Sequence, residues 1–460
     1  QRIPRSMLFT AGTGEADSAG AALDVNDLPK PSPRQMAWQQ LETIAFAHFT
    51  INTFTDREWG EGTEKPALFN PTEFDANQWV RALKDAGFKQ LILTAKHHDG
   101  FCLWPSKYTD HTVASSPWKD GKGDVVREVV DACRAAGLKV GLYLSPWDRH
   151  EPSYGDSPRY NDFYVNQLTE LLSNYGPIHE VWFDGACGEG PNGKRQVYDW
   201  QRYIATIRRL QPEAVIFSDA GPDVRWVGNE HGFAGETNWS TLHRNEFHPG
   251  SPNYRQLTEG HEDGRYWVPA ECDVSIRPGW FYHASQDGQV KSVAQLIDIY
   301  YKSVGRNGVL LLNIPPDRRG LFHETDVARL REFRAVLDET FATNLAADGH
   351  FAMPCPADVL FDGQRSSYWS AGANVHDASF ELELPQPATF DRALLQERIE
   401  AGQRINAFTL DAYTDGEWRT IAEGTTVGYK RLLRFEPITA TKVRVTIHAP
   451  RGAPALCEFG

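Results

Sequence analysis

The fold is decided by a unit of sequence that runs from Leu91-Ile92-Leu93-Thr94, through a helical pattern at 124–136, to Val140-Gly141-Leu142-Tyr143-Leu144. The two outer runs are continuously apolar, which is typical of parallel strands buried on both faces. The segment between them repeats valines at helical spacing and is followed by Gly137, a residue type that commonly ends a helix. A strand, a helix and a second strand in this order predict a parallel sheet covered by helices.

The same alternation continues from about residue 34 to residue 340. Helical patterns also occupy 75–86, 158–175 and 196–210, and the further runs that fit strands are 44–49, 181–184, 215–218, 266–269 and 309–312. This rhythm predicts a (β/α)8-like barrel. The alternative is a doubly wound open sheet, although no glycine-rich phosphate fingerprint follows the first strand. Between 230 and 266 the rhythm fails, so we expect long loops and an irregular closure of the barrel there.

The hydrophobic pattern of the sequence changes after residue 345. Short runs at 379–384, 408–413 and 442–447 alternate with a period near two, and Gly, Pro and Asp separate them. This pattern predicts an antiparallel β-sandwich. We therefore expect three parts, which are an N-terminal arm at 1–33 rich in small residues and proline, a catalytic barrel at 34–345, and a C-terminal β-sandwich at 346–460.

Charge and composition exclude several classes of protein. The net charge of −14 argues against DNA or RNA as a partner, because both are polyanions. No apolar run approaches the ~20 residues that a membrane span needs. The six cysteines show no C-x-x-C spacing, so we expect mostly buried free thiols rather than a zinc ribbon. Nothing in the sequence indicates an oligomeric state, and the 14 Trp could fill a core or stack on sugar rings.

The ends of the predicted strands carry an unusual mixture of polar and aromatic residues. In a barrel, active-site residues sit at the carboxyl ends of strands. The residues that follow these ends are His48 with Glu58 and Trp59, then Lys96-His97-His98-Asp99-Gly100, Tyr143, Trp182-Phe183-Asp184, Trp226-Val227-Gly228-Asn229-Glu230, and Glu271-Cys272-Asp273. Residues that serve only to pack the protein interior would not need this mixture at so many strand ends, so these residues are candidates for a functional site.

Two carboxylates stand out among these candidates. Asp184 follows an apolar strand directly, where a carboxylate is costly to half-bury unless it is paired or functional. It could also cap the following loop, and Glu230 could be a solvated loop residue. A nucleophile and an acid/base are what glycoside hydrolysis requires. Asp184 and Glu230 fit these roles, while Glu236 and Glu271 compete with Glu230 for the second one.

The adjacent histidines His97 and His98 could suggest a metal site. Neighbouring residues on a strand point to opposite faces, so the two rings chelate one ion poorly. No further set of ligands is evident in the sequence, and we expect neither a metal nor another cofactor. Hydrogen bonds from these histidines to sugar hydroxyls fit the pattern better.

At these residues the sequence resembles glycoside hydrolase family 29, the α-L-fucosidases, from about residue 48 to residue 316. The motifs that carry the resemblance are His48-Phe49 with Glu58-Trp59-Gly60, Lys96-His97-His98-Asp99-Gly100-Phe101, Val181-Trp182-Phe183-Asp184-Gly185, and Leu312-Asn313-Ile314-Pro315-Pro316. The resemblance implies that Asp184 is the nucleophile. It also implies a fucose pocket formed by His48, Glu58, Trp59, His97, His98, Tyr143 and Trp182.

Two further segments resemble the subgroup that acts on α-1,3- and α-1,4-linked fucose. They are 225–230, which ends in Asn229-Glu230, and 271–282, which contains Trp280. This resemblance implies that Glu230 is the acid/base and that Trp280 packs against the fucose methyl group. The tail, with its segments at 391–397 and 428–431, resembles the discoidin-like modules attached to such enzymes.

The resemblance implies a retaining exo-α-L-fucosidase that removes fucose from branched glycans of the Lewis a and Lewis x kind. The alternatives are a broader or α-1,2/1,6 linkage preference, a carbohydrate-binding protein without activity, and a metal-dependent sugar isomerase. The first 35 residues lack the apolar stretch of a signal peptide, and the chain starts at Gln1. We expect a processed or truncated chain from a secreted or periplasmic bacterial protein.

Overall fold

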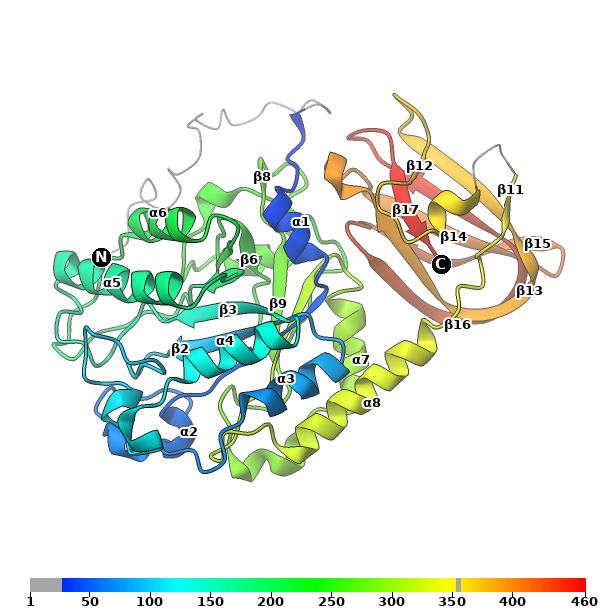
Figure 1. The fold of residues 1–460 in the computed structure, drawn as a ribbon. Helices are drawn as coiled ribbons and strands as arrows, with labels where there is room; N and C mark the ends of the chain where they lie inside the picture. Colours follow the sequence, from blue (N-terminus) through cyan, green and yellow to red (C-terminus); the bar gives the residue numbers. More distant parts are fainter. Residues whose placement is uncertain (1–26, 353–356) are drawn as a thin grey trace.

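The computed structural model describes residues 27–352 and 357–460. Most of the expected N-terminal arm, and Cys355, lie outside these residues. A larger lobe contains the first part of the chain, and a smaller lobe of strands contains the last part (Figure 1). Helix α8 leads from the first lobe to the second.

The larger lobe is a closed barrel of parallel strands, with neighbours in the order β1-β10-β9-β6-β5-β4-β3-β2. This closure confirms the predicted barrel, and the open doubly wound sheet is wrong. The barrel strands are β1 (Thr43–Ala47), β2 (Gln90–Lys96), β3 (Lys139–Leu144), β4 (Glu180–Trp182), β5 (Val215–Ser218), β6 (Val224–Trp226), β9 (Ala270–Ser275) and β10 (Val309–Asn313).

One predicted barrel strand is wrong. The run at 266–269 contributes only β8 (Tyr266–Trp267), which pairs antiparallel with β7 (Thr241–Leu242) outside the barrel. The barrel uses β9 instead, where Glu271, Asp273 and Ser275 alternate with apolar residues. The sequence hid this strand because its alternate side chains are polar groups that the barrel buries through hydrogen bonds.

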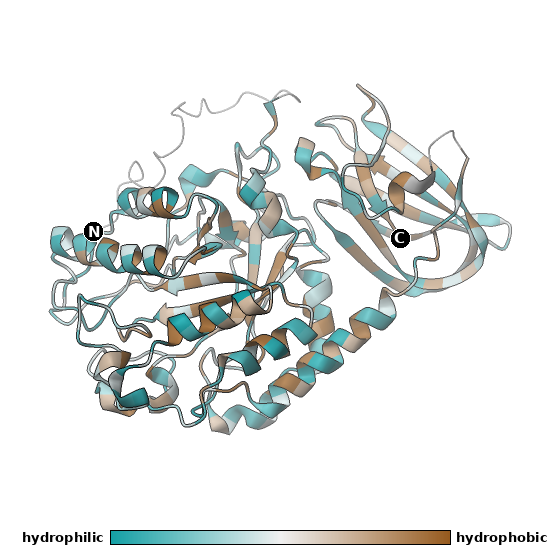
Figure 2. Cartoon of the chain, viewed as in Figure 1, coloured by the Kyte–Doolittle hydropathy of each residue, from teal (hydrophilic) through white to brown (hydrophobic). Residues whose placement is uncertain are grey.

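Helices cover the outside of the barrel with their apolar faces turned inward (Figure 2). The helical patterns are confirmed. Asp75 and Asp124 cap α3 and α4, because their carboxylates accept hydrogen bonds from backbone N–H groups in the first turn of each helix. No α-helix lies between β6 and β9 in the described chain, as expected for irregular closure. The helices are α1 (Pro33–Gln39), α2 (Asn52–Thr55), α3 (Ala76–Asp85), α4 (Val125–Ala135), α5 (Ser157–Asn174), α6 (Trp200–Leu210), α7 (Val293–Lys302) and α8 (Glu324–Thr340).

The smaller lobe is an antiparallel sandwich with its own apolar core. Its two long strands shift register near Glu383 and Phe390, and such irregularities let a strand bend. The predicted runs lie within β13, β14 and β16. The strands are β11 (His350–Phe351), β12 (Trp369–Ser370), β13 (Asp377–Glu397), β14 (Ala407–Thr414), β15 (Glu417–Gly424), β16 (Arg431–His448) and β17 (Ala455–Phe459).

The sandwich contacts the long segment between β6 and β9. Gln403 accepts a hydrogen bond from the backbone N–H of Ser240 at 2.8 Å and donates one to the carbonyl of Asn238 at 3.0 Å. Arg431 donates to the backbone carbonyl of Glu236 and lies 3.5 Å from its carboxylate. The second lobe therefore supports a segment whose middle part reaches the pocket described below.

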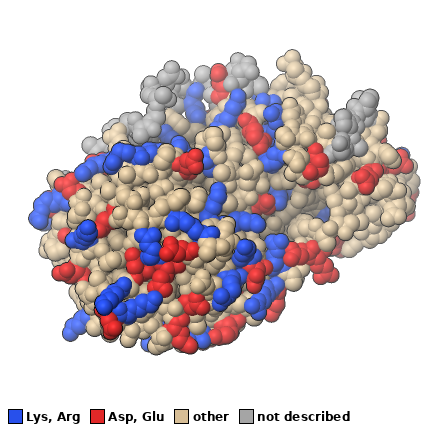
Figure 3. All heavy atoms as spheres, in the orientation of Figure 1, with Lys and Arg blue, Asp and Glu red and all other residues tan. Residues whose placement is uncertain are grey.

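On the face drawn in Figure 3, acidic and basic side chains intermingle. No helix among the described residues is long and apolar enough to cross a bilayer. The described cysteines are free thiols, and Cys187 is the exposed one among them.

Candidate active site

A pocket of about 410 Å³ opens at the carboxyl ends of the barrel strands. It collects side chains from strand ends that lie far apart in the sequence. Nine of the ten predicted site residues line this pocket. Six of them are named with their strands or helices below, Trp59, Glu230 and Trp280 come from loops, and Tyr143 lies beneath the surface. The lining residues include Phe46 on β1 and His48 after it, His97 and His98 after β2, Trp182 and Asp184 at β4, Asp219 after β5, Glu58 after α2, and Asp273 on β9.

Asp184 lies just beyond the end of β4, with its side chain one-quarter exposed to the pocket. Its Oδ2 accepts a 2.7 Å hydrogen bond from the hydroxyl of Tyr143, and its Oδ1 accepts one of 2.8 Å from the backbone N–H of Ala186. Burial and the neighbouring carboxylate raise the pKa of Tyr143 well above its ordinary value, so the phenol remains a donor. These contacts fix the orientation of the carboxylate at the pocket floor.

Trp182 forms the floor of the pocket beside Asp184. Its ring stacks on Phe217 with centroids 3.9 Å apart, and its indole N–H donates to Oε1 of Glu271 at 2.8 Å. The other oxygen of Glu271 accepts from the indole of Trp38 at 2.8 Å. Glu271 is fully buried inside the barrel, where burial raises its pKa. It therefore supports the floor and does not reach the pocket.

The rings of His48 and His98 are oriented by polar groups behind them. Nδ1 of His48 donates to the amide oxygen of Asn313 at 2.8 Å. Nδ1 of His98 lies 2.7 Å from the hydroxyl of Ser145, which itself donates to the carbonyl of Trp147 at 2.7 Å. Since that hydroxyl proton is already used, Nδ1 of His98 is the donor, and Nε2 of each ring is left as an acceptor. Burial lowers the pKa of both, to about 4 for His48, and keeps them neutral.

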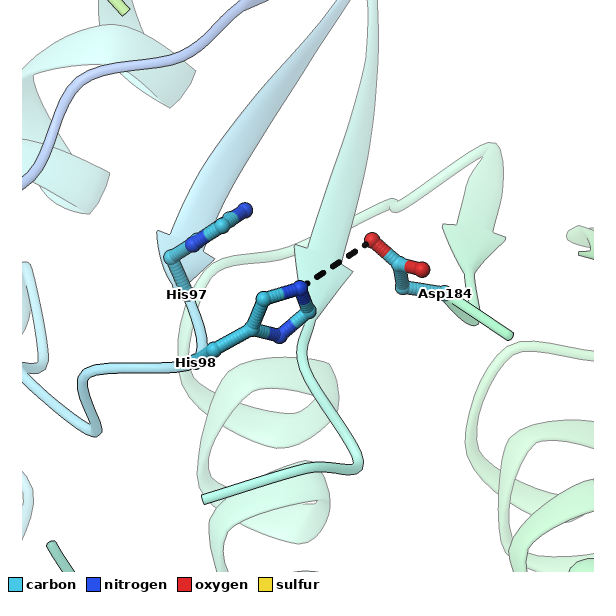
Figure 4. A group of neighbouring side chains, drawn as sticks. All are labelled: His97, His98 and Asp184. Carbon is cyan, nitrogen blue, oxygen red and sulfur yellow. Dashed lines mark ion pairs between the residues drawn. The ribbon is translucent and has the colours of Figure 1, made fainter. Parts of the chain in front are cut away.

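The group of His97, His98 and Asp184 is also where a metal ion could be held (Figure 4). One ligand atom from each residue lies within 4.8 Å of the others, and Nε2 of His98 is 3.7 Å from Oδ2 of Asp184. Burial lowers the pKa of His97 well below its ordinary value, so it too is neutral. The expectation that the site uses no metal stays a prediction.

Glu230 lies at the mouth of the pocket, after β6. Its Oε2 is 3.4 Å from the indole nitrogen of Trp280, which donates to it. Although the residue reaches solvent, partial desolvation raises the pKa of Glu230, and the charges of Asp184 and Glu58 add to this effect against the opposing Trp280 hydrogen bond. A carboxyl group with a raised pKa beside a second carboxylate is suited to donate a proton.

The other loop residues form the entrance. Glu58 lines the pocket and accepts backbone N–H groups from Trp280 at 2.6 Å and Phe281 at 3.0 Å. Trp59 is 55% exposed and meets His98 and Trp147 edge to face. An exposed indole held in this way offers a flat apolar face to a sugar ring.

Comparisons with known proteins agree with this geometry. The model of the α-L-fucosidase family matches residues 33–339. The chain belongs to the α-L-fucosidase family. It is a glycoside hydrolase, which decides against the sugar isomerase and against a binding protein without activity. A model of the F5/8 type C domain matches residues 341–459 and agrees with the discoidin-like sandwich.

Individual relatives of this fucosidase share most of its length. Alpha-L-fucosidase 1 of Arabidopsis thaliana is 47% identical and covers 94% of this chain and 87% of its own. A crystal structure of a glycoside hydrolase 29 family member from a rumen bacterium is 42% identical, with a TM-score of 0.85, covering 95% of this chain and 77% of that one. A Ruminococcus gnavus GH29 fucosidase solved in complex with fucose is 35% identical, with a TM-score of 0.86 and 96% of both chains covered.

The structure adds two aspartates to the fucosidase pocket: Asp219, which the sequence reasoning did not consider, and Asp273, which it named at a strand end without assigning it a role. Asp219 is buried, accepts the backbone N–H of Gly250 at 2.7 Å, and has its pKa raised by burial to about 7. Asp273 accepts the indole N–H of Trp226 at 2.9 Å. Both aspartates follow or lie on barrel strands, and the position of Asp219 after the run at 215–218 was a signal that could have found it.

The third glutamate considered for acid/base lies elsewhere in the fucosidase. Glu236 is exposed and pairs with Arg431 of the sandwich. Neither Glu236 nor Glu271 lines the pocket, so only Glu230 of the three competing glutamates does so. Asp99 of the Lys96–Phe101 motif does not line the pocket either. It is fully buried and accepts a hydrogen bond from the backbone N–H of Phe101 at 2.7 Å, which is a structural role.

Proposed function

We propose that this α-L-fucosidase is a retaining exo-enzyme in which Asp184 is the nucleophile and Glu230 is the acid/base. The observation that supports this most strongly is the contrast between the two carboxyl groups in one pocket. Asp184 is held from both oxygens at the floor, whereas Glu230 stands at the mouth with a raised pKa. Retaining glycosidases need this division between an ionised nucleophile and a protonated acid.

The reaction proceeds in two displacements. Asp184 attacks the anomeric carbon of a terminal α-L-fucosyl unit, the bond to the leaving oxygen breaks, and Glu230 gives that oxygen its proton. In the second step Glu230 takes a proton from water, the water oxygen bonds to the anomeric carbon, and Asp184 leaves. Two inversions give L-fucose with its configuration retained.

The histidines bind the hydroxyl groups of the fucose. The free Nε2 atoms of His48 and His98 accept hydrogen bonds from sugar O–H groups, since their Nδ1 protons are used by Asn313 and Ser145. Trp280, whose ring lies 5.2 Å from that of His48, offers an apolar surface for the methyl group of fucose. Glu58, His97, Trp59 and Trp182 complete the pocket wall.

The preferred substrate is fucose linked α-1,3 or α-1,4 to GlcNAc in a branched glycan of the Lewis a or Lewis x kind. The segment between Glu230 and Tyr266 supports this, because Gly250, Ser251, Pro252 and Tyr254 line the pocket and the ring of Tyr254 lies 5.5 Å from that of Trp226. Groups placed there can contact a galactose branch beside the GlcNAc, and such contacts raise kcat/KM for the branched substrate selectively.

A panel of fucosylated oligosaccharides tests this specificity. Lewis-type trisaccharides should be cleaved faster than the corresponding linear disaccharides and faster than an α-1,2-fucosylated glycan, with fucose release as the measurement. If the linear or α-1,2 compounds are cleaved faster, the enzyme has the broader or different linkage preference.

The location that suits this activity is outside the cytoplasm, in the periplasm or the surrounding medium, because fucosylated glycans are displayed on cell surfaces and secreted glycoproteins. Fractionation of the source cells with an antibody against the enzyme tests this. Recovery in the cytoplasmic fraction alone would contradict the proposed location.

A further inference from the structure

His283 lies behind the wall of the pocket, between two carboxylates from another part of the chain. Its Nδ1 is 2.7 Å from Oδ1 of Asp56, and its Nε2 is 2.7 Å from Oε2 of Glu58. The ring is only 10% exposed. We propose that His283, as an imidazolium that donates to both carboxylates, is a positioning residue that fixes Glu58 and, through it, the Trp280 loop against Glu230.

The hydrogen-bonding partners decide the protonation state. An ionised carboxylate can only accept, so each of the two short contacts requires an N–H on the ring. A neutral imidazole carries only one N–H and would place a lone pair against one of the carboxylates. In keeping with this geometry, the pKa of His283 is raised, because the hydrogen bonds to Glu58 and Asp56 together outweigh the opposing effect of burial.

A continuous set of contacts connects this histidine to the acid/base. The carboxylate of Glu58 accepts hydrogen bonds from Nε2 of His283 and from the backbone N–H groups of Trp280 and Phe281. One carboxylate therefore holds the loop in place. The indole of Trp280 then donates to Glu230. Loss of the imidazolium leaves Glu58 with fewer hydrogen-bond donors and lets its carboxylate move. The Trp280 loop, which Glu58 holds, is then less well fixed against Glu230.

The backbone conformation of Asp56 suits an aspartate. It ends α2 in the left-handed region, with φ of 58°, a conformation that Asp and Asn adopt more readily than other residues with a side chain. The charged groups that face the ring are Asp56 and Glu58. Asp56 also lines a second cavity, whose other charged or titratable residues are Tyr282, Asp317, Arg318, Arg319, His323 and Glu324. Asp287, on the loop of His283 itself, is paired with Arg277.

The pH dependence follows from the direction of the shift. A histidine whose pKa is raised in the folded protein holds its partners below its unfolded pKa and loses them as pH rises through the folded pKa. The arrangement around His283 is therefore complete in acid and weakens in alkali. This loss adds to the alkaline loss of the protonated Glu230, on whose role as acid/base the inference rests.

The two effects separate on an aryl α-L-fucoside with a good leaving group, because that substrate needs no proton from Glu230. On it, kcat/KM reports the first step alone. Glu58 and Trp280 still line the pocket that binds its fucosyl unit, so an alkaline limb of the pH profile reports His283 acting through these two residues. His283→Gln replaces the imidazolium with a neutral amide whose donors lie on a single nitrogen, and the residue caps no helix through its side chain. Asp56→Asn keeps the shape and the tolerance of positive φ but removes the charge. His448→Gln, which breaks an exposed pair with Asp377 in the sandwich, is the matched control.

We expect His283→Gln to lower kcat/KM about 10- to 100-fold near pH 6, as small displacements of catalytic groups do, and to remove the alkaline limb. Asp56→Asn should move the limb to lower pH by about one unit, because an opposing charge is lost. His448→Gln should behave as the unmodified enzyme. Thermal melting of each variant checks that the fold is retained.

A limb that stays in place in Asp56→Asn, or that persists in His283→Gln, overturns the proposal, as does an equal loss of activity at every pH in both variants. The role of Glu230 is tested separately by Glu230→Ala on glycans with poor leaving groups. If that variant stays active while the histidine results hold, the acid/base assignment fails and the positioning role of His283 towards Glu58 stands.

Discussion

The hydroxyl of Tyr143 donates a hydrogen bond of 2.7 Å to Oδ2 of Asp184, the same oxygen that lies 3.7 Å from Nε2 of His98. Tyr143→Phe keeps the buried ring and removes this donor. A hydrogen bond to a charged group contributes about 1.5–3 kcal/mol, so we expect kcat/KM to fall about 10- to 150-fold. Tyr164→Phe is the matched control, since its hydroxyl donates to the carbonyl of Leu144 away from the pocket. That variant should lose stability rather than activity, and equal kinetic losses in both variants would contradict the role of Tyr143.

Asp184→Gly should abolish turnover while the protein stays folded, because the lost carboxylate acts in the chemistry and is not part of the apolar core. Azide added to this variant should restore part of the activity and yield a fucosyl azide of inverted configuration. Product analysis by NMR distinguishes the two anomers. Activity near that of the unmodified enzyme without azide would show that Asp184 is not the nucleophile.

Glu230→Ala should affect substrates with poor leaving groups most, because these require a proton in the first step. An aryl fucoside with a good leaving group should still form the fucosyl-enzyme and then stall. In the unmodified enzyme, kcat/KM on glycans should fall as pH rises through the pKa of Glu230, and because this pKa is raised the fall should lie at higher pH than for an ordinary glutamate. Equal losses on both substrate types in the variant would point to a binding role.

Lys96, which directly precedes His97, forms a buried ion pair of 3.0 Å with Asp148. Asp148→Asn leaves the lysine charge uncompensated, and breaking such a pair costs about 3–5 kcal/mol of unfolding free energy. Lys96 and two backbone N–H groups lower the pKa of Asp148 against the effect of burial. A depressed pKa gives stability that is present above the unfolded value and is lost as pH falls through the folded one. Denaturant unfolding at neutral and acidic pH measures both effects, and a variant as stable as the unmodified enzyme at neutral pH would contradict them.

Local patterns were sufficient for much of the fold. Continuous apolar runs identified strands such as β2 and β3, and helical spacing identified α3 to α6, because burial of these elements repeats with a fixed period along the chain. The pattern was insufficient for β6 and β9. Both carry buried polar side chains, such as Arg225 and Glu271, whose partners come from distant segments.

The sequence by itself determined the barrel, the sandwich and the place of Asp184 at a strand end, because each depends on the order of nearby residues. Only the tertiary structure decided among the glutamates, turning Glu271 beneath Trp182 and Glu236 towards Arg431 while Glu230 lines the pocket. The same holds for Asp56 and His283, which stand 227 positions apart. The direction of a side chain depends on strand register and on loops that meet in space, and neither is encoded in a local period.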